Sequence, residues 1–162
     1  MKKYGIIAFT VVFLLLACLH VGAQEGQGII DIENGVVFGY NLNTDTVGIG
    51  HGLGFNLTLS DVLKVGFRNI NGDGTNVHSF NLFMFDYRVF NGLGVLITAG
   101  SDNTLAGTPP VTGMSVYYNA IERVIQGRLS TRLKIEFGYL NAVTQTLDNG
   151  LVSGTISASL GF

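Results

Sequence analysis

Apolar and polar residues alternate along most of the chain beyond residue 28, and this is the period of a β-strand. The segment 151–162 shows the pattern most clearly. One of its faces carries Val152, Ile156, Ala158, Leu160 and Phe162, and the other carries Ser153, Thr155, Ser157, Ser159 and Gly161. Successive side chains of a strand point to opposite faces, so this segment is predicted to be a strand with one apolar face.

The same alternation predicts eight strands in all, separated by turn residues. We expect them at about 29–42, 46–59, 63–68, 77–89, 93–99, 113–121, 133–139 and 151–162. The segments 69–76, 101–112 and 144–150 are predicted loops, and 122–131 is predicted to be a connection that contains at most a helical turn. In the fourth segment both faces carry apolar residues, so the pattern leaves its facing open. An even number of strands in an up-and-down barrel places both ends of the barrel on one side.

The second predicted strand has the clearest faces in the chain. Its apolar face is Val47, Ile49, Leu53, Phe55, Leu57 and Leu59, interrupted by His51, and its opposite face includes Gly48, Gly50, Gly52 and Gly54. Glycine contributes no packing to a strand, so four in alternate positions indicate a face that lines a tight, strongly curved interior. Elsewhere we expect this inner face to consist mainly of glycine, serine, asparagine and threonine.

Composition indicates which way the apolar face points. Only 12% of the residues are charged, against about 25% in typical soluble domains. That is too few to cover a water-facing exterior, so we expect the apolar face to point outward into lipid, with the aromatic residues Tyr40, Tyr118, Tyr139 and Phe162 near the strand ends. A soluble barrel with the opposite sense is the alternative. The net charge of −2 and the lack of a basic run give no basis for nucleic-acid binding.

The N-terminus has the features of an export signal. Lys2 and Lys3 precede an apolar run over 6–19, and Val-Gly-Ala at 21–23 is a small-residue cleavage site. We therefore divide the chain into a cleaved signal peptide, 1–23, and one barrel domain, 24–162. Cys18 ends a Leu-Leu-Ala-Cys sequence that also resembles a lipoprotein cleavage site, which is the alternative.

The predicted inner face carries charges of both signs. They are Asp31, Glu33, Lys64, Arg68, Lys134 and Glu136. Buried charges are stable only when they are paired and hydrogen-bonded, and eight strands enclose little more than side-chain volume. We expect these six residues to form a salt-bridged plug that fixes the barrel. A path for protons or ions through them is the alternative.

No motif in the chain predicts a cofactor or a metal, and we expect no enzymatic activity. The segment 69–75 resembles the start of a calcium-binding loop, but Asp73 is its one carboxylate, and Phe80 stands where such a loop needs glutamate. Two histidines lie in the predicted barrel, His51 and His78. Neither is spaced to form a serine–histidine–acid arrangement.

On its export signal, strand alternation and terminal phenylalanine, the chain resembles the small eight-stranded bacterial outer-membrane proteins, the group of the outer-membrane protein A barrel and outer-membrane protein X. The resemblance implies an all-β, eight-stranded antiparallel up-and-down transmembrane β-barrel in the cell outer membrane. It implies outer-membrane lipid as surroundings and recognition of Phe162 and its strand by the barrel-assembly machinery. We expect a non-enzymatic structural or surface-interaction role, with a possible extracellular ligand at loop 101–112. The alternatives are a narrow pore and a lipid-modifying enzyme.

Overall fold

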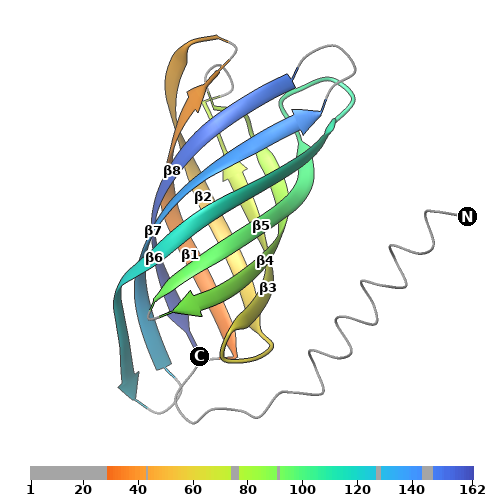
Figure 1. Ribbon diagram of the computed structural model, residues 1–162. Helices are drawn as coiled ribbons and strands as arrows, with labels where there is room; N and C mark the ends of the chain where they lie inside the picture. The colour runs from red at the N-terminus through yellow and green to blue at the C-terminus, as the bar shows by residue number, and fades with distance from the viewer. Residues whose placement is uncertain (1–28, 43, 74–76, 91, 127–128, 144–147) are drawn as a thin grey trace, which may run out of the picture.

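The computed structural model describes residues 29–42, 44–73, 77–90, 92–126, 129–143 and 148–162. Within these ranges lie eight strands: β1 (Ile30–Asn41), β2 (Thr46–Thr58), β3 (Leu63–Asn71), β4 (Phe80–Phe90), β5 (Leu93–Asp102), β6 (Pro110–Gln126), β7 (Leu129–Val143) and β8 (Asp148–Gly161). Each strand is antiparallel to the next, and β8 pairs with β1, so the sheet closes into a barrel (Figure 1). The predicted eight-stranded antiparallel barrel is confirmed. The predicted signal peptide, Cys18 included, lies outside the described residues.

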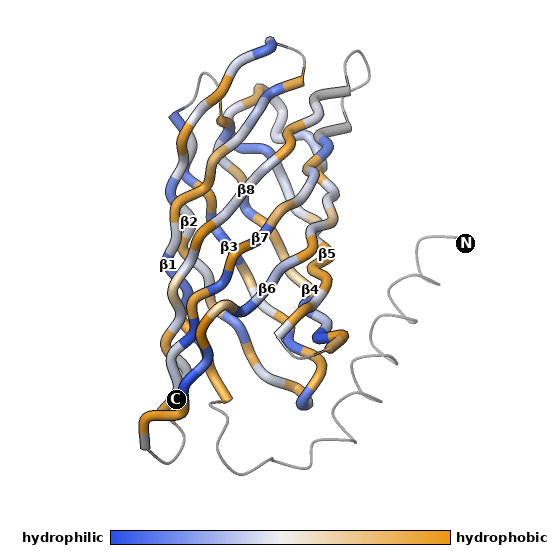
Figure 2. The backbone as a smooth tube through the Cα atoms, turned by 60° about the vertical axis from the view of Figure 1, so that its left-hand side comes forward, coloured by the Kyte–Doolittle hydropathy of each residue, from blue (hydrophilic) through white to orange (hydrophobic). Residues whose placement is uncertain are grey.

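The sense of the alternation is also as predicted. In β1, Phe38 is 43% exposed on the outside, whereas its neighbour Val37 is fully buried inside. Orange and blue alternate along the strands in Figure 2 for the same reason. The model also gives the facing of β4, because Leu82 and Met84 are buried inside and Tyr87 is exposed outside. Among the described residues, no helix has the length and apolar character needed to cross a membrane.

The predicted connection at 122–131 is wrong. β6 runs on to Gln126 and β7 begins at Leu129, and the two strands pair as one long hairpin. The register shifts between Asn119 and Ile121, which is a β-bulge, and the bulge breaks the period of two from which the strand was predicted.

Other strand ends also differ from prediction, because backbone pairing extends strands past their apolar alternation. β3 continues to Asn71 and β5 to Asp102, which shortens the loops expected at 69–76 and 101–112. β8 likewise begins at Asp148, within the expected loop 144–150. β4 is the exception at its start, because it begins at Phe80 rather than at 77.

The glycine row of β2 makes room for larger side chains from neighbouring strands. All four glycines are buried. A Cβ atom added at Gly52 would lie 3.9 Å from Cδ of Arg68, and one added at Gly54 would lie 3.4 Å from Cβ of Glu33. Both are ordinary van der Waals distances, so a methyl group would fit at either position, whereas a larger side chain would compete for the space that Arg68 and Glu33 occupy.

One half of the interior is apolar, which corrects the expectation of an inner face made mainly of small polar residues. A buried cluster lies toward the loops opposite the chain ends and consists of Val37, Ile70, Val77, Phe80, Leu82, Val111, Leu140 and Leu151. The alternation did not indicate this cluster because six of the eight strands contribute to it, none with more than two side chains.

The packing predicts a contrast between two glycines. A Cβ atom at Gly66 would meet the backbone of Phe55 and Asn56, including a contact of 2.9 Å to Cα of Asn56, whereas at Gly154 the nearest atom would be 3.6 Å away in the Phe137 ring. We expect Gly66→Ala to lower the free energy of unfolding by about 1–3 kcal/mol, because the clash is with backbone. Gly154→Ala should change it by less than about 0.5 kcal/mol. Urea unfolding followed by circular dichroism measures both, and equal effects would contradict this account.

Candidate functional site: interior charges and outer loops

Three strands bring the six predicted interior charges together. Asp31 and Glu33 come from β1, Lys64 and Arg68 from β3, and Lys134 and Glu136 from β7. Within each pair the residues are two or four positions apart, so both side chains point to the same face of the strand. All six are buried, each at most 7% exposed.

Arg68 is the centre of the first group of contacts. Its Nη2 atom lies 2.8 Å from Oε1 of Glu33 and 3.0 Å from Oε2 of Glu136, and its Nη1 atom donates a hydrogen bond of 3.0 Å to Oε1 of Glu136. Lys134 Nζ donates to Oε2 of Glu33 at 2.8 Å. Ser115 Oγ donates to Glu136 at 2.7 Å. One guanidinium therefore joins carboxylates of strands on both sides of β8.

Asp31 is the centre of the second group, nearer the chain ends. Lys64 Nζ donates to its Oδ2 atom at 2.5 Å, and Arg132 Nη2 donates to both carboxylate oxygens at 2.8 and 3.0 Å. Arg132 was not predicted as part of the network. It lies two residues before Lys134 and therefore on the same face of β7. It was missed because the strand was predicted to begin at 133, whereas β7 begins at Leu129.

Asp86 and Tyr117 also belong to the network and were not predicted as part of it. The Tyr117 hydroxyl donates to Asp86 at 2.5 Å, and Lys134 Nζ lies 5.4 Å from the centre of the Tyr117 ring. Asp86 was missed because the facing of its strand was open. With Asp86 and Arg132 added to the six predicted charges, the described interior network holds four acidic and four basic side chains. The formal charges of these eight side chains therefore sum to zero.

Little free volume separates the charged network from the apolar cluster. A cavity between the network and the apolar cluster, bordered by Arg68, Leu82 and Glu136, measures about 10 Å³. That is the lower limit for one water molecule. Within the described ranges, no three histidine, cysteine, aspartate or glutamate side chains lie close enough to hold a metal ion.

The two histidines occupy different surroundings. His51 is exposed on the outer face of β2. His78 Nδ1 lies 2.6 Å from Oδ2 of Asp102, whose side chain is fully buried at the end of β5. Sequence spacing did not indicate this pair because 24 residues separate its members. In the described part of the chain, no hydrogen bond joins His78 to a serine.

The His78–Asp102 pair is one of several links between the β3–β4 and β5–β6 loops. Asp102 Oδ1 accepts the N–H of Thr104 at 2.8 Å. Ser79 N–H donates to Thr104 Oγ1 at 2.7 Å, and Asn103 N–H donates to the Ser79 carbonyl at 2.7 Å. The β5–β6 loop, residues 103–109, is therefore held to its neighbour at its base. Thr104, Ala106 and Thr108 are exposed.

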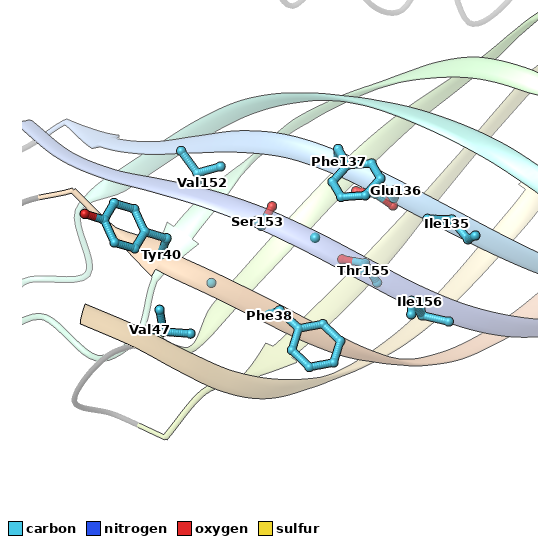
Figure 3. A pocket seen from close by; sticks show the side chains of 12 residues that line it. Phe38, Tyr40, Val47, Ile135, Glu136, Phe137, Val152, Ser153, Thr155 and Ile156 are labelled. Atoms are coloured by element: carbon cyan, nitrogen blue, oxygen red, sulfur yellow. The ribbon is translucent and has the colours of Figure 1, made fainter. Parts of the chain in front are cut away.

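A shallow groove crosses the outer face where β1 meets β8. Its volume is about 430 Å³, and it lies over Gly154, whose partners in register are Phe38 on β1 and Phe137 on β7 (Figure 3). Val152 and Ile156 border it along β8. The groove exists because glycine stands at an outward position between two large aromatic side chains.

Comparison with known proteins gives a likeness of shape and no family. No family model matches the chain, and no curated protein matches it. A solved structure described as "De novo design of transmembrane beta-barrels" is similar over 84% of this chain and 97% of its own, with 17% identity and a TM-score of 0.49.

The difference in burial predicts that two arginine–carboxylate contacts contribute differently to the free energy of unfolding. Arg68→Met leaves two buried carboxylates without their shared cation and should lower the free energy of unfolding by about 3–5 kcal/mol. Arg88 binds Glu122 at 2.8 and 3.0 Å in a pair whose side chains are 23% and 30% exposed. Arg88→Met should cost less than about 1 kcal/mol. Equal losses in a urea titration of both variants would refute a central role for Arg68.

Proposed function

We propose that the protein is an integral β-barrel of the bacterial outer membrane, exported by a signal peptide that is then removed. The observation that carries the proposal is the reversed distribution of polarity. Phe55, Phe67 and Phe137 are 48%, 63% and 69% exposed on the outer face, while the charged network is buried inside. Soluble proteins rarely expose a continuous apolar surface of this extent, and a lipid bilayer is the solvent that favours it.

The height of the apolar surface supports the same proposal. On β2, the outward row runs from Val47 to Leu57, ten residues further on, interrupted by His51. At about 3.3 Å per residue and a strand tilt near 40°, the row spans about 25 Å along the barrel axis. This matches the apolar band of about 25 Å in outer-membrane barrels. Exposed aromatic residues stand near both ends, Tyr40 and Tyr139 at one and Tyr118 and Phe162 at the other.

Lipid is the partner that the outer face supports best. The groove over Gly154 is lined mainly by apolar side chains and opens sideways from the barrel wall. In a bilayer, acyl chains fill such a groove. Phe162, which closes the barrel by exchanging hydrogen bonds with Ile30 at 2.9 and 3.0 Å, is our candidate for the signal read by the barrel-assembly machinery.

We assign the protein a non-enzymatic role, structural or in surface interaction, and place the interaction at the loops opposite the chain ends. The β5–β6 loop, 103–109 within the expected 101–112, is the candidate ligand surface, because its base is held by Asp102 and its tip is exposed. A fixed loop loses less conformational entropy on binding than a free one. A lipid-modifying enzyme is less well supported, because the His78–Asp102 pair has no serine hydrogen-bonded to it among the described residues.

Membrane insertion can be tested by arginine substitutions at two depths. Leu53 lies near the middle of the outward row of β2 and Val47 near its end. We expect Leu53→Arg to cost about 2–4 kcal/mol of folding free energy in phosphatidylcholine vesicles, and Val47→Arg at most about 1 kcal/mol. Urea titrations of vesicle-bound protein, followed by heat-modifiable gel migration, give both values. A soluble barrel would show no depth dependence and would be released from membranes by carbonate.

The narrow pore is a separate candidate, and the interior disfavours it. Ion pairs, together with a small cluster of Met84, Leu96 and Tyr117, fill one half of the barrel, and apolar side chains fill the other. We expect the reconstituted protein to produce no discrete conductance steps in planar lipid bilayers. Steps that change when Lys64, Arg68 or Lys134 is neutralised would establish a pore and overturn this assignment.

A further inference from the structure

The β6–β7 hairpin extends past the neighbouring strands on the side of the barrel where the C-terminus lies (Figure 1). The pairing of β5 with β6 ends at Leu93 and Tyr118, followed by one hydrogen bond of 2.9 Å from Asn119 N–H to the Gly92 carbonyl. β6 continues to Gln126, and in the described residues its segment 120–126 has β7 as its one strand neighbour. One edge of this segment is therefore open over about 20 Å.

The open edge offers backbone hydrogen-bonding groups. In an antiparallel pair, alternate residues direct their N–H and C=O toward opposite neighbours. Asn119 directs its N–H toward β5. Ala120 is the extra residue of the bulge, and beyond it Glu122 lies opposite Arg132 and Val124 opposite Ser130. Counted in this register, the N–H groups of Glu122 and Val124 point to the open edge.

The side chains beside this edge are apolar and exposed. Ile121, Val124 and Ile125 are 47%, 55% and 58% exposed, and every residue from 120 to 125 is exposed. Figure 2 shows an apolar stretch in orange at this tip. Proteins usually protect an open edge with charged side chains, proline, β-bulges or a short strand. This edge carries Glu122, Arg123 and the bulge after Asn119, but it is long and bears three large exposed apolar side chains, so its backbone beyond the bulge is a site for addition of another strand.

A second copy of this chain does not fit the edge if the protein is the membrane barrel proposed above, and on this point the inference depends on that function. Antiparallel pairing of two β6 edges would turn the second barrel upside down. Parallel pairing would require a two-fold axis along β6, and the strands of such a barrel tilt by about 35–45° from its axis. The axis of the second barrel would then be inclined by about 70–90°, twice the strand tilt, to the axis of the first. Neither arrangement places both barrels upright in one bilayer.

Charge indicates what the edge would bind. Glu122 is already paired with Arg88 and lies 3.3 Å from Nε of Arg132. Arg123 is exposed, and the ion pairs found among the described residues do not include it. On its face of the strand it lies between Ile121 and Ile125, so the described part of the edge presents a positive charge between apolar side chains.

We propose that the open edge of β6, residues 120–126, binds an extended segment of another protein on the side of the chain ends, by antiparallel strand addition. That segment carries a carboxylate opposite Arg123 and apolar side chains opposite Ile121 and Val124. Its backbone forms hydrogen bonds with Glu122 and Val124. The barrel in this way fixes a partner at the membrane surface without opening its interior.

The test uses the full barrel in detergent micelles and a fluorescently labelled peptide, Thr-Val-Val-Glu-Thr-Ile-Thr, which places glutamate opposite Arg123. Fluorescence anisotropy should show saturable binding. N-methylation of the third and fifth peptide amides, which face the edge, should weaken binding at least about tenfold, because two hydrogen bonds are lost. N-methylation of the fourth and sixth amides, which face away, is the matched control and should have little effect.

Charge reversal tests the register. Arg123→Glu should weaken binding of the glutamate peptide and favour the same peptide with lysine in place of glutamate. Equal effects of the two N-methylation patterns, no saturable binding, or a dimer in sedimentation that Arg123→Glu dissociates would each overturn the proposal. Heat-modifiable migration and vesicle flotation of the same samples separate the two proposals. A barrel that floats with vesicles but binds no peptide refutes the strand addition alone, whereas a barrel that does not float refutes the membrane function.

Discussion

The limited space inside a closed eight-stranded sheet is the constraint on which the rest of this structure depends. Such a barrel holds little more than its own side chains, so not every strand can place a large residue at every level. β2 contributes bare backbone at Gly52 and Gly54, where Arg68 and Glu33 pack so close that a side chain much larger than a methyl group would compete with them for space. The glycine row and the charge network are therefore two parts of one packing solution.

The two halves of the interior are stabilised by different forces. Near the chain ends, ion pairs of about 3 Å join acidic and basic side chains, Asp86 accepts a hydrogen bond from Tyr117, and Met84 and Leu96 pack beside them. The geometry of the ion pairs compensates for the loss of water. Toward the loops, apolar side chains pack around Leu82 and Val37. The result is a filled barrel. The groups that are exposed for binding lie on the outer face, in the loops and at the β6 edge.

Much of the fold could be predicted from the sequence because alternation in a strand is a local property. The facing of β1 and β2, and the inward position of Arg68 and Glu136, follow from a period of two. Where the period fails, prediction fails as well. The bulge after Asn119 concealed the second half of β6 and, with it, the role of Arg132 opposite Glu122.

Contacts between residues distant in sequence could not be predicted from local pattern. The His78–Asp102 pair and the apolar cluster depend on which strands become neighbours when the sheet closes. No short motif encodes either of them. The same is true of the open edge, because it results from the different lengths of β5 and β6 and from no property of residues 120–126 alone.

The ion pairs between β1 and β7 have a consequence for assembly. Lys134 and Arg132 bind Glu33 and Asp31, residues 101 positions earlier in the chain, across the strand that is made last. A sheet that has not closed therefore holds several charges without partners, and contacts of such long range form late in folding. Partial barrels are disfavoured for this reason, and closure of the sheet is a cooperative event that joins the two ends of the chain.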